Sequence, residues 1–120
     1  MALALEKLLT NQKAVDLADR ISVPAQTFPR GHGFLADQLN RAALSIAANI
    51  AESNGRFTKA DRKDSIGIAR RSVQECVPLL ELGRRRHLLN DDRHDKLKDD
   101  LEEMARMLSG LISGLDKPRT

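Results

Sequence analysis

Three histidines and a single cysteine are the side chains in this sequence best suited to ligate a metal or to act as a nucleophile. A di-iron site in a four-helix bundle needs inward-facing glutamates and Glu-x-x-His spacing on two helices. The nearest approach is the segment Asp91–His94, where an aspartate stands in for the glutamate, and the sequence has no second copy. Cys76 lies between Val73 and Leu80 on an apolar stripe, a position typical of a buried, inert thiol. With no glycine-rich phosphate loop and no paired-carboxylate site either, the sequence predicts no metal, no cofactor and no enzymatic activity.

Basic side chains form the second group that could do chemistry, because they can hold phosphates. Residues 58–86 include eight basic and four acidic residues, a net charge of +4, whereas residues 91–103 include seven acidic and three basic residues, a net charge of −4. This segregation indicates either a phosphate-binding surface or arginines that complement a helix dipole and pair with the acidic start of the next helix. Both interpretations stay open. The candidate phosphate-binding residues are Arg56, Lys59, Arg62, Lys63, Arg70, Arg71, Arg84, Arg85 and Arg86.

Length and composition limit the class of protein. A chain of 120 residues with 41% hydrophobic residues can bury one core, so we predict a single domain over residues 1–120. The net charge of +3 permits a polyanionic partner without requiring one. One cysteine cannot form an internal disulfide, which favours a reducing cytoplasm. Residues 1–9 look apolar, but Glu6 and Lys7 interrupt them, so they indicate neither a signal peptide nor a membrane span.

The three aromatic residues are all phenylalanines, which argues against β-strands. So low an aromatic content also offers no stacking platforms, and base-specific binding of single strands is not expected. Apolar residues recur at three- and four-residue steps, which predicts helices over about 5–27, 34–54, 58–86 and 92–115. Pro24 falls inside the first pattern and predicts a kink near Arg20 or an early end to that helix. The patterns together predict an all-α protein with the fold of an antiparallel up-and-down four-helix bundle.

Each predicted helix has one stripe that should face the core. Gly55 is positioned as the C-terminal cap of the second helix, and Thr58 followed by Asp61 resembles a capping box at the start of the third. The predicted core residues are Ala14, Leu17, Ala18, Ile21, Ala25 and Phe28 in the first helix, Leu35, Leu39, Ala42, Ala43, Ile46 and Ile50 in the second, Ile66, Ala69, Val73, Cys76, Val77 and Leu80 in the third, and Leu97, Leu101, Met104, Leu108, Leu111 and Leu115 in the fourth.

The second and third helices carry more apolar surface than a lone bundle needs. A bundle helix needs one apolar face roughly 100° wide, whereas the second helix is apolar around well over half of its circumference. A second surface should therefore cover it, which predicts a homo-oligomer. The candidate interface residues are Ala36, Leu44, Ala47, Ala48, Ala51, Ile68, Leu79 and Leu82.

The run from Gln38 to Glu52, closed by Gly55 and Arg56, resembles a known signature. It is similar to the second helix of the S23-like family, bacterial four-helix bundles first noted as proteins encoded in intervening sequences of 23S ribosomal RNA genes. The shorter segments Gln12–Ala14, Ser72–Glu75 and Leu108–Ile112 also resemble the family pattern. The chain departs from that pattern at Ala47, where many members have proline, and at Ser53 and Asn54, where the turn is often shorter.

The resemblance implies a four-helix bundle that assembles into a homopentamer. A related branch, the accessory proteins of diversity-generating retroelements, is implied to bind nucleic acid and a reverse transcriptase. Arg41, Asn49 and Glu52 are polar positions of the motif. Asn49 and Glu52 serve either a hydrogen-bond network at a subunit interface, a ligand site, or a local contact to the turn at Gly55 and Arg56, which is the simplest interpretation.

Our leading hypothesis is therefore a cytoplasmic, non-enzymatic homo-oligomer, a ring of five. Its basic surface would bind DNA, RNA or a nucleic-acid enzyme. The alternative is a purely structural or protein-interaction scaffold that does not bind nucleic acid.

Overall fold

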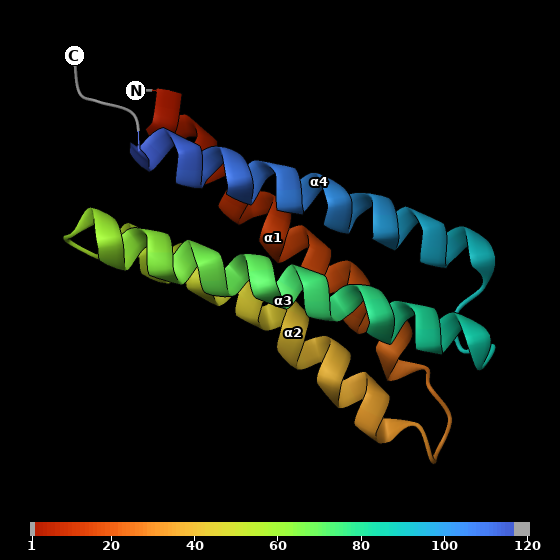
Figure 1. Ribbon diagram of the computed structural model, residues 1–120. Coiled ribbons are helices and arrows are strands. Elements are labelled where there is room, and N and C mark those ends of the chain that lie inside the picture. The colour runs from red at the N-terminus through yellow and green to blue at the C-terminus, as the bar shows by residue number, and fades with distance from the viewer. Residues whose placement is uncertain (1, 117–120) are drawn as a thin grey trace.

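The computed structural model describes the backbone of residues 2–116 and the side chains of that range except those of residues 2–6 and 23–26. Four helices follow one another, α1 (Ala2–Gln26), α2 (Gly33–Asn54), α3 (Lys59–Arg85) and α4 (Asp91–Asp116). They lie side by side in an elongated bundle of 54 × 22 × 19 Å (Figure 1). Each helix packs against its two neighbours, and α4 returns to α1, so the chain runs up and down around a ring of four. The described residues include no strand, and the predicted all-α four-helix bundle is confirmed.

The predicted helix limits lie within three residues of the observed ones. Of the two alternatives predicted for Pro24, a kink near Arg20 or an early end of the helix, the early end is wrong, because α1 continues to Gln26. Pro24 has no backbone N–H and removes one hydrogen bond from this part of the helix. Leu17 and Ile21, which precede it, are each only 1% exposed, so their packing in the core stabilises the helix there.

The core consists almost entirely of the predicted residues. Their side chains are buried, except that Ala18, Phe28 and Val77 are half-buried and pack against the core from its edge. Ala25 lies outside the described side chains. Leu89, in the turn between α3 and α4, adds an unpredicted core residue, and a Cβ placed on Gly83 would lie only 3.3 Å from its Cδ1 atom. Glycine at that position therefore lets the turn fold back onto the end of α3.

The helix ends use both predicted and unpredicted caps. Thr58 accepts a hydrogen bond from the Asp61 amide at 3.1 Å, as the capping box predicts. Gly55 does cap α2, but its φ of −91° is right-handed and makes no use of the conformational freedom of glycine. Asn90, which the sequence analysis passed over, caps α4 by accepting from the Arg93 amide at 2.7 Å.

The end of α3 has a turn that glycine usually makes. The Leu88 amide donates to the Gly83 carbonyl at 2.9 Å, and the His87 amide donates to the Arg84 carbonyl at 3.0 Å. These two bonds define a Schellman motif, whose penultimate residue adopts a left-handed conformation. His87 occupies that position with a φ of 59°. A non-glycine residue is therefore held in a strained conformation between α3 and α4.

Candidate nucleic-acid interface

Local partners hold two of the three arginines at the end of α3. Arg84 pairs with Glu81 through two N–H groups, the Nε–Oε1 distance being 2.9 Å, and its Nη1 atom lies 3.7 Å from Asp91 Oδ1. Arg85 Nε lies 3.5 Å from the same Glu81 oxygen. The hydrogen bond from Arg84 lowers the pKa of Glu81 and raises the pKa of the arginine. Arg86 makes no ion pair with any residue described here. Arg84 thus pairs with the acidic start of the next helix, the structural alternative considered from the sequence.

A second basic group gathers at the opposite end of the bundle, around the turn between α2 and α3. Arg56 pairs with Glu52 one helical turn back, and Lys63 Nζ lies 2.8 Å from Asp116 Oδ1 at the end of α4. Arg62 donates from Nε to the carbonyl oxygen of Arg56 at 2.8 Å. The charges of Arg56 and Lys63 are therefore compensated, whereas Arg62 uses its guanidinium to hold the turn.

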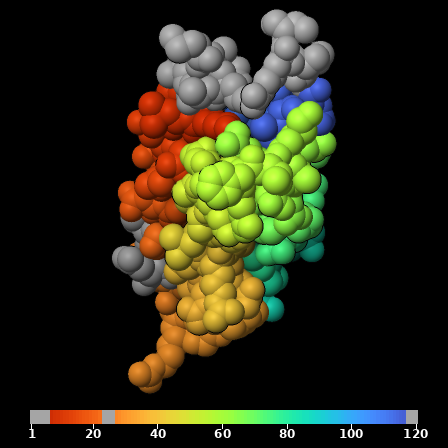
Figure 2. All heavy atoms as spheres, turned by 90° about the vertical axis from the view of Figure 1, so that its left-hand side faces the viewer, coloured from red at the N-terminus to blue at the C-terminus, as the bar shows by residue number. Residues whose placement is uncertain are grey.

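Lys7 of α1 joins this end although it lies more than 50 positions away from Arg62 in the sequence. Burial lowers the pKa of Lys7, and the positive charge of Arg62 lowers it further. The view onto this end shows the turn and the start of α3 between the red atoms of α1 and the blue atoms of α4 (Figure 2). Phe57 lies in the turn and is 97% exposed.

Arg71, from the middle of α3, lies on a groove between α2 and α3, and Arg70 beside it is exposed. The groove has a volume of about 330 Å³ and is lined by Gln38, Arg41, Ala42, Ser45, Ile68, Arg71, Ser72 and Glu75. Two hydroxyls join its walls, because Ser72 Oγ lies 2.9 Å from Ser45 Oγ. Arg41 and Arg71 form no ion pair within the described part of the chain, so the groove keeps two uncompensated cations.

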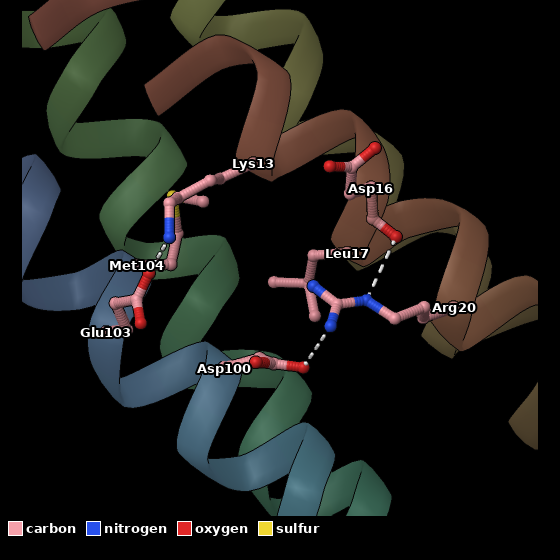
Figure 3. Close-up of a pocket in the computed structure, with 7 residues that line it drawn as sticks. All are labelled: Lys13, Asp16, Leu17, Arg20, Asp100, Glu103 and Met104. Carbon is pink, nitrogen blue, oxygen red and sulfur yellow. Dashed lines mark hydrogen bonds and ion pairs between the residues drawn. The ribbon is translucent and has the colours of Figure 1, made fainter. Parts of the chain in front are cut away.

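Two other carboxylates of α4, Asp100 and Glu103, pair with cations of α1. Lys13 pairs with Glu103, and Arg20 Nη1 lies 2.9 Å from Asp100 Oδ2 (Figure 3). Both pairs span a pocket of about 220 Å³ between the two helices. The hydrogen bond from Lys13 lowers the pKa of Glu103. These two ion pairs therefore connect α1 and α4 at the surface of the bundle.

The other reactive groups do not converge. Burial raises the pKa of the Cys76 thiol to about 12, so the nucleophilic thiolate does not form near neutral pH. His94 is buried, with Nδ1 3.1 Å from Asp95 Oδ1. Among the described side chains, no group of three or more histidines, cysteines or carboxylates is placed to hold a metal ion. None of the helices, within the residues described, combines the length and the apolar character needed to cross a membrane.

The predicted interface residues divide by exposure. Leu44 is 61% exposed, and Ala48 and Ala51 are also exposed on α2. The other five are half-buried. Three of them, Ala47, Leu79 and Leu82, pack against the core of the same chain, and the remaining two are Ala36 and Ile68. The extra apolar row on α3 is thus largely used within the monomer, whereas the one on α2 is not.

Residues 6–110 match the family of 23S rRNA-intervening sequence proteins. The chain belongs to this family. Its fold is similar to a solved structure from Bacteroides thetaiotaomicron, described as a protein of unknown function from the S23 ribosomal protein family, with a TM-score of 0.84 and 23% identity. That likeness covers 90% of this chain and 98% of the other, and at this identity it shows the fold alone. No curated protein matches the sequence. Neither description names an enzymatic activity.

In this member of the 23S rRNA-intervening sequence protein family, the motif residues make local contacts. Glu52 pairs with Arg56 in the turn, as the simpler interpretation predicts. Asn49 instead donates from Nδ2 to the Ser45 carbonyl oxygen at 2.9 Å and to the Ser45 hydroxyl at 3.1 Å. Arg41 lines the groove described above. The motif therefore builds the contact between α2 and α3 around Ser45.

Sequence reasoning missed several residues of these surfaces. Lys7, Lys13 and Arg20 lie on α1, where they are isolated cations outside any charge run, so the sequence carries no local signal for them. Leu8 and Val15 are apolar residues of α1 that remain 54% and 53% exposed. Their seven-residue spacing places them on one side of the helix, away from the stripe, and this spacing was the available signal.

Proposed function

We propose that this 23S rRNA-intervening sequence protein is a non-enzymatic scaffold that assembles into a homo-oligomer, a ring of five subunits. In this proposal its basic surface binds nucleic acid or a nucleic-acid enzyme in the cytoplasm. The proposed assembly rests on large apolar side chains that are exposed on α1 and α2. Leu8, Val15 and Leu44 are large apolar residues there, and each is more than half exposed.

Light scattering or native mass spectrometry at micromolar concentration tests the assembly. We expect a multiple of the 13.3 kDa chain mass and a shift to lower mass in Leu44→Gln. Phe34→Gln is the matched control, because Phe34 is 58% exposed on the same helix but does not belong to the predicted interface. A parent protein that remains at 13.3 kDa would contradict the proposed assembly.

The proposed nucleic-acid binding rests on cations that lack an acidic partner. Arg70, Arg71, Arg86, Lys59 and Arg41 form no ion pair with the described side chains, although the chain has 17 acidic residues. A ring would present each set several times, and weak phosphate contacts would add through avidity. The alternative, a scaffold without nucleic acid, is favoured by the local pairing of other arginines, such as Arg84.

Titration of labelled DNA and RNA at several salt concentrations separates these two functions. Binding through phosphates should weaken steeply with salt. Replacing Arg84, Arg85 and Arg86 together with Gln tests the group at the end of α3. Unchanged affinity and salt slope would exclude that group, whereas no binding by the parent even at low salt would favour the purely structural scaffold.

A further inference from the structure

Phe57 is the most exposed large apolar residue described, at 97%, and it stands in the turn between α2 and α3. The other phenylalanines differ from it, because Phe28 packs against the core and Phe34 is 58% exposed. The cap of α3 comes from the neighbouring Thr58, so neither the core nor the cap uses the ring of Phe57. A single exposed apolar residue is common on protein surfaces. Whether the exposed ring of Phe57 has a functional role depends on the residues around it.

The turn on both sides of Phe57 is fixed. On one side, the Arg56 amide donates to the Ser53 carbonyl at 3.3 Å, and the Arg56 carbonyl accepts from Arg62 at 2.8 Å. On the other side, the Thr58 carbonyl accepts from the Arg62 amide at 3.0 Å. The ring therefore projects from a backbone that is already ordered, and binding through it would cost little loop entropy.

Three cations around the turn, Lys7, Lys59 and Arg62, form no ion pair with a described side chain, whereas Arg56 and Lys63 do. The positive charge of Arg62 lowers the pKa of Lys7. Lys59 begins α3, whose N-terminal dipole adds positive potential at the same place. The charge of Lys59 also acts on Asp116 and lowers the pKa of that carboxyl. Like charges held together by the fold are relieved when an anion binds between them.

We propose that this end of the bundle, formed by Lys7, Phe57, Lys59 and Arg62, binds single-stranded nucleic acid. Phe57 stacks on one base, and the three cations hold the phosphates on either side of it. This inference rests on the proposed nucleic-acid binding and assigns it to a site other than the arginines at the end of α3. It also supplies the stacking platform that the low aromatic content argued against.

The chemistry of the site favours a single strand over other anions. A single strand presents planar bases and phosphates in alternation, which matches one exposed ring flanked by cations. A duplex hides the faces of its bases within the stack, so the ring would find no partner there. Stacking on any base is tolerant of sequence, so we expect little discrimination among single strands. The view in Figure 2 shows the turn exposed at the end of the bundle, where no other helix covers it.

The absence of tryptophan and tyrosine allows a direct optical test. The variant Phe57→Trp introduces the sole tryptophan, whose fluorescence should be quenched when a base stacks on it. Labelled single-stranded 15-mers of RNA and DNA and a 15-base-pair duplex are titrated into the parent, Phe57→Trp and Phe57→Ala at several salt concentrations. We expect Phe57→Ala to weaken single-strand binding by about 5- to 150-fold, the loss of one stacked base, without changing the salt slope. Phe57→Trp should retain the affinity.

Matched variants separate failure of this inference from failure of the proposed function. Phe34→Ala removes an exposed ring at the other end of α2 and should leave binding unchanged. Lys59→Gln with Arg62→Gln should flatten the salt slope. Single-strand binding that is insensitive to Phe57→Ala would overturn the site and leave the proposed function standing. No binding to any nucleic acid would overturn both. A blue shift of the Phe57→Trp emission with anionic phosphatidylserine vesicles, together with no quenching by nucleic acid, would overturn the site in favour of a membrane surface.

Discussion

Leu108 tests whether the seam of α4 carries the stability of the bundle. The side chain is 0% exposed and belongs to the core cluster shared by the four helices. Leu108→Ala removes three carbon atoms from a buried position. Transfer alone accounts for about 0.8 kcal/mol per buried CH₂ group, or roughly 2.4 kcal/mol in total. The cavity left behind raises the expected loss to about 3 to 4 kcal/mol.

Urea denaturation followed by circular dichroism at 222 nm measures this loss. A chain of this size is expected to have a total unfolding free energy of roughly 6 to 18 kcal/mol, so the variant should still fold. At a slope of about 1 to 3 kcal/mol per molar urea, the midpoint should fall by at least about 1 M. Parent and variant are compared at one protein concentration, because assembly would contribute to stability by mass action.

Phe34→Ala serves as the control, because it removes a larger side chain from a position that is 58% exposed. We expect it to cost less than about 1 kcal/mol. A loss below about 1 kcal/mol for Leu108→Ala, or a larger loss for Phe34→Ala, would refute the assignment of the core. A changed slope with an unchanged midpoint would instead indicate altered compactness rather than a lost core contact.

Four further predictions concern the helix ends, the thiol and pH. His87→Gly should stabilise the fold by about 0.5 to 1 kcal/mol in thermal denaturation, because glycine adopts the left-handed φ of 59° without strain. Thr58→Ala should destabilise the fold by about 0.5 to 2 kcal/mol in urea denaturation, through loss of the cap of α3, and a neutral result would contradict that cap. Cys76, with its pKa raised to about 12, should react with a thiol reagent at pH 8 only after denaturant is added, and rapid reaction of the folded protein would show that it is accessible. Lys13 lowers the pKa of Glu103, and Lys63 lowers the pKa of Asp116, so both ion pairs should contribute to stability above the ordinary pKa values of 4.5 and 3.8. This stability should be lost as the pH falls through the lowered pKa values. Urea midpoints measured from pH 7 to pH 2 should therefore decline less steeply in a Glu103→Gln, Asp116→Asn variant.

The positions and core faces of the helices could be predicted because they depend on local spacing. Burial along a helix repeats every three to four residues, so residues such as Leu101, Met104 and Leu108 identify the inward side without knowledge of the partner helix. The cap at Thr58 was equally local, because its donor lies three residues away. His87 was harder to predict, since its left-handed conformation follows from Leu89 folding back onto Gly83.

The surfaces depended on which helices became neighbours. Lys13 and Glu103 lie 90 positions apart, and nothing in their spacing indicates that α1 and α4 close the ring side by side. One of the two interpretations of the charge runs was that the arginines at the end of the third helix pair with the acidic start of the next helix, and Arg84 Nη1 lies 3.7 Å from Asp91 Oδ1.

The sequence alone determined the four helices, their buried faces and the likeness to an S23-like bundle, because periodicity and motif are properties of contiguous residues. The tertiary structure decided which cations remain without partners and which apolar side chains remain uncovered. Phe57 illustrates the difference. The sequence shows only that it is one of three phenylalanines, whereas the structure shows that Phe57 is 97% exposed, Phe34 is 58% exposed and Phe28 packs against the core. The exposure of a side chain depends on all the residues that surround it in the folded protein. The fold determines which residues those are, and the residues adjacent in the sequence do not.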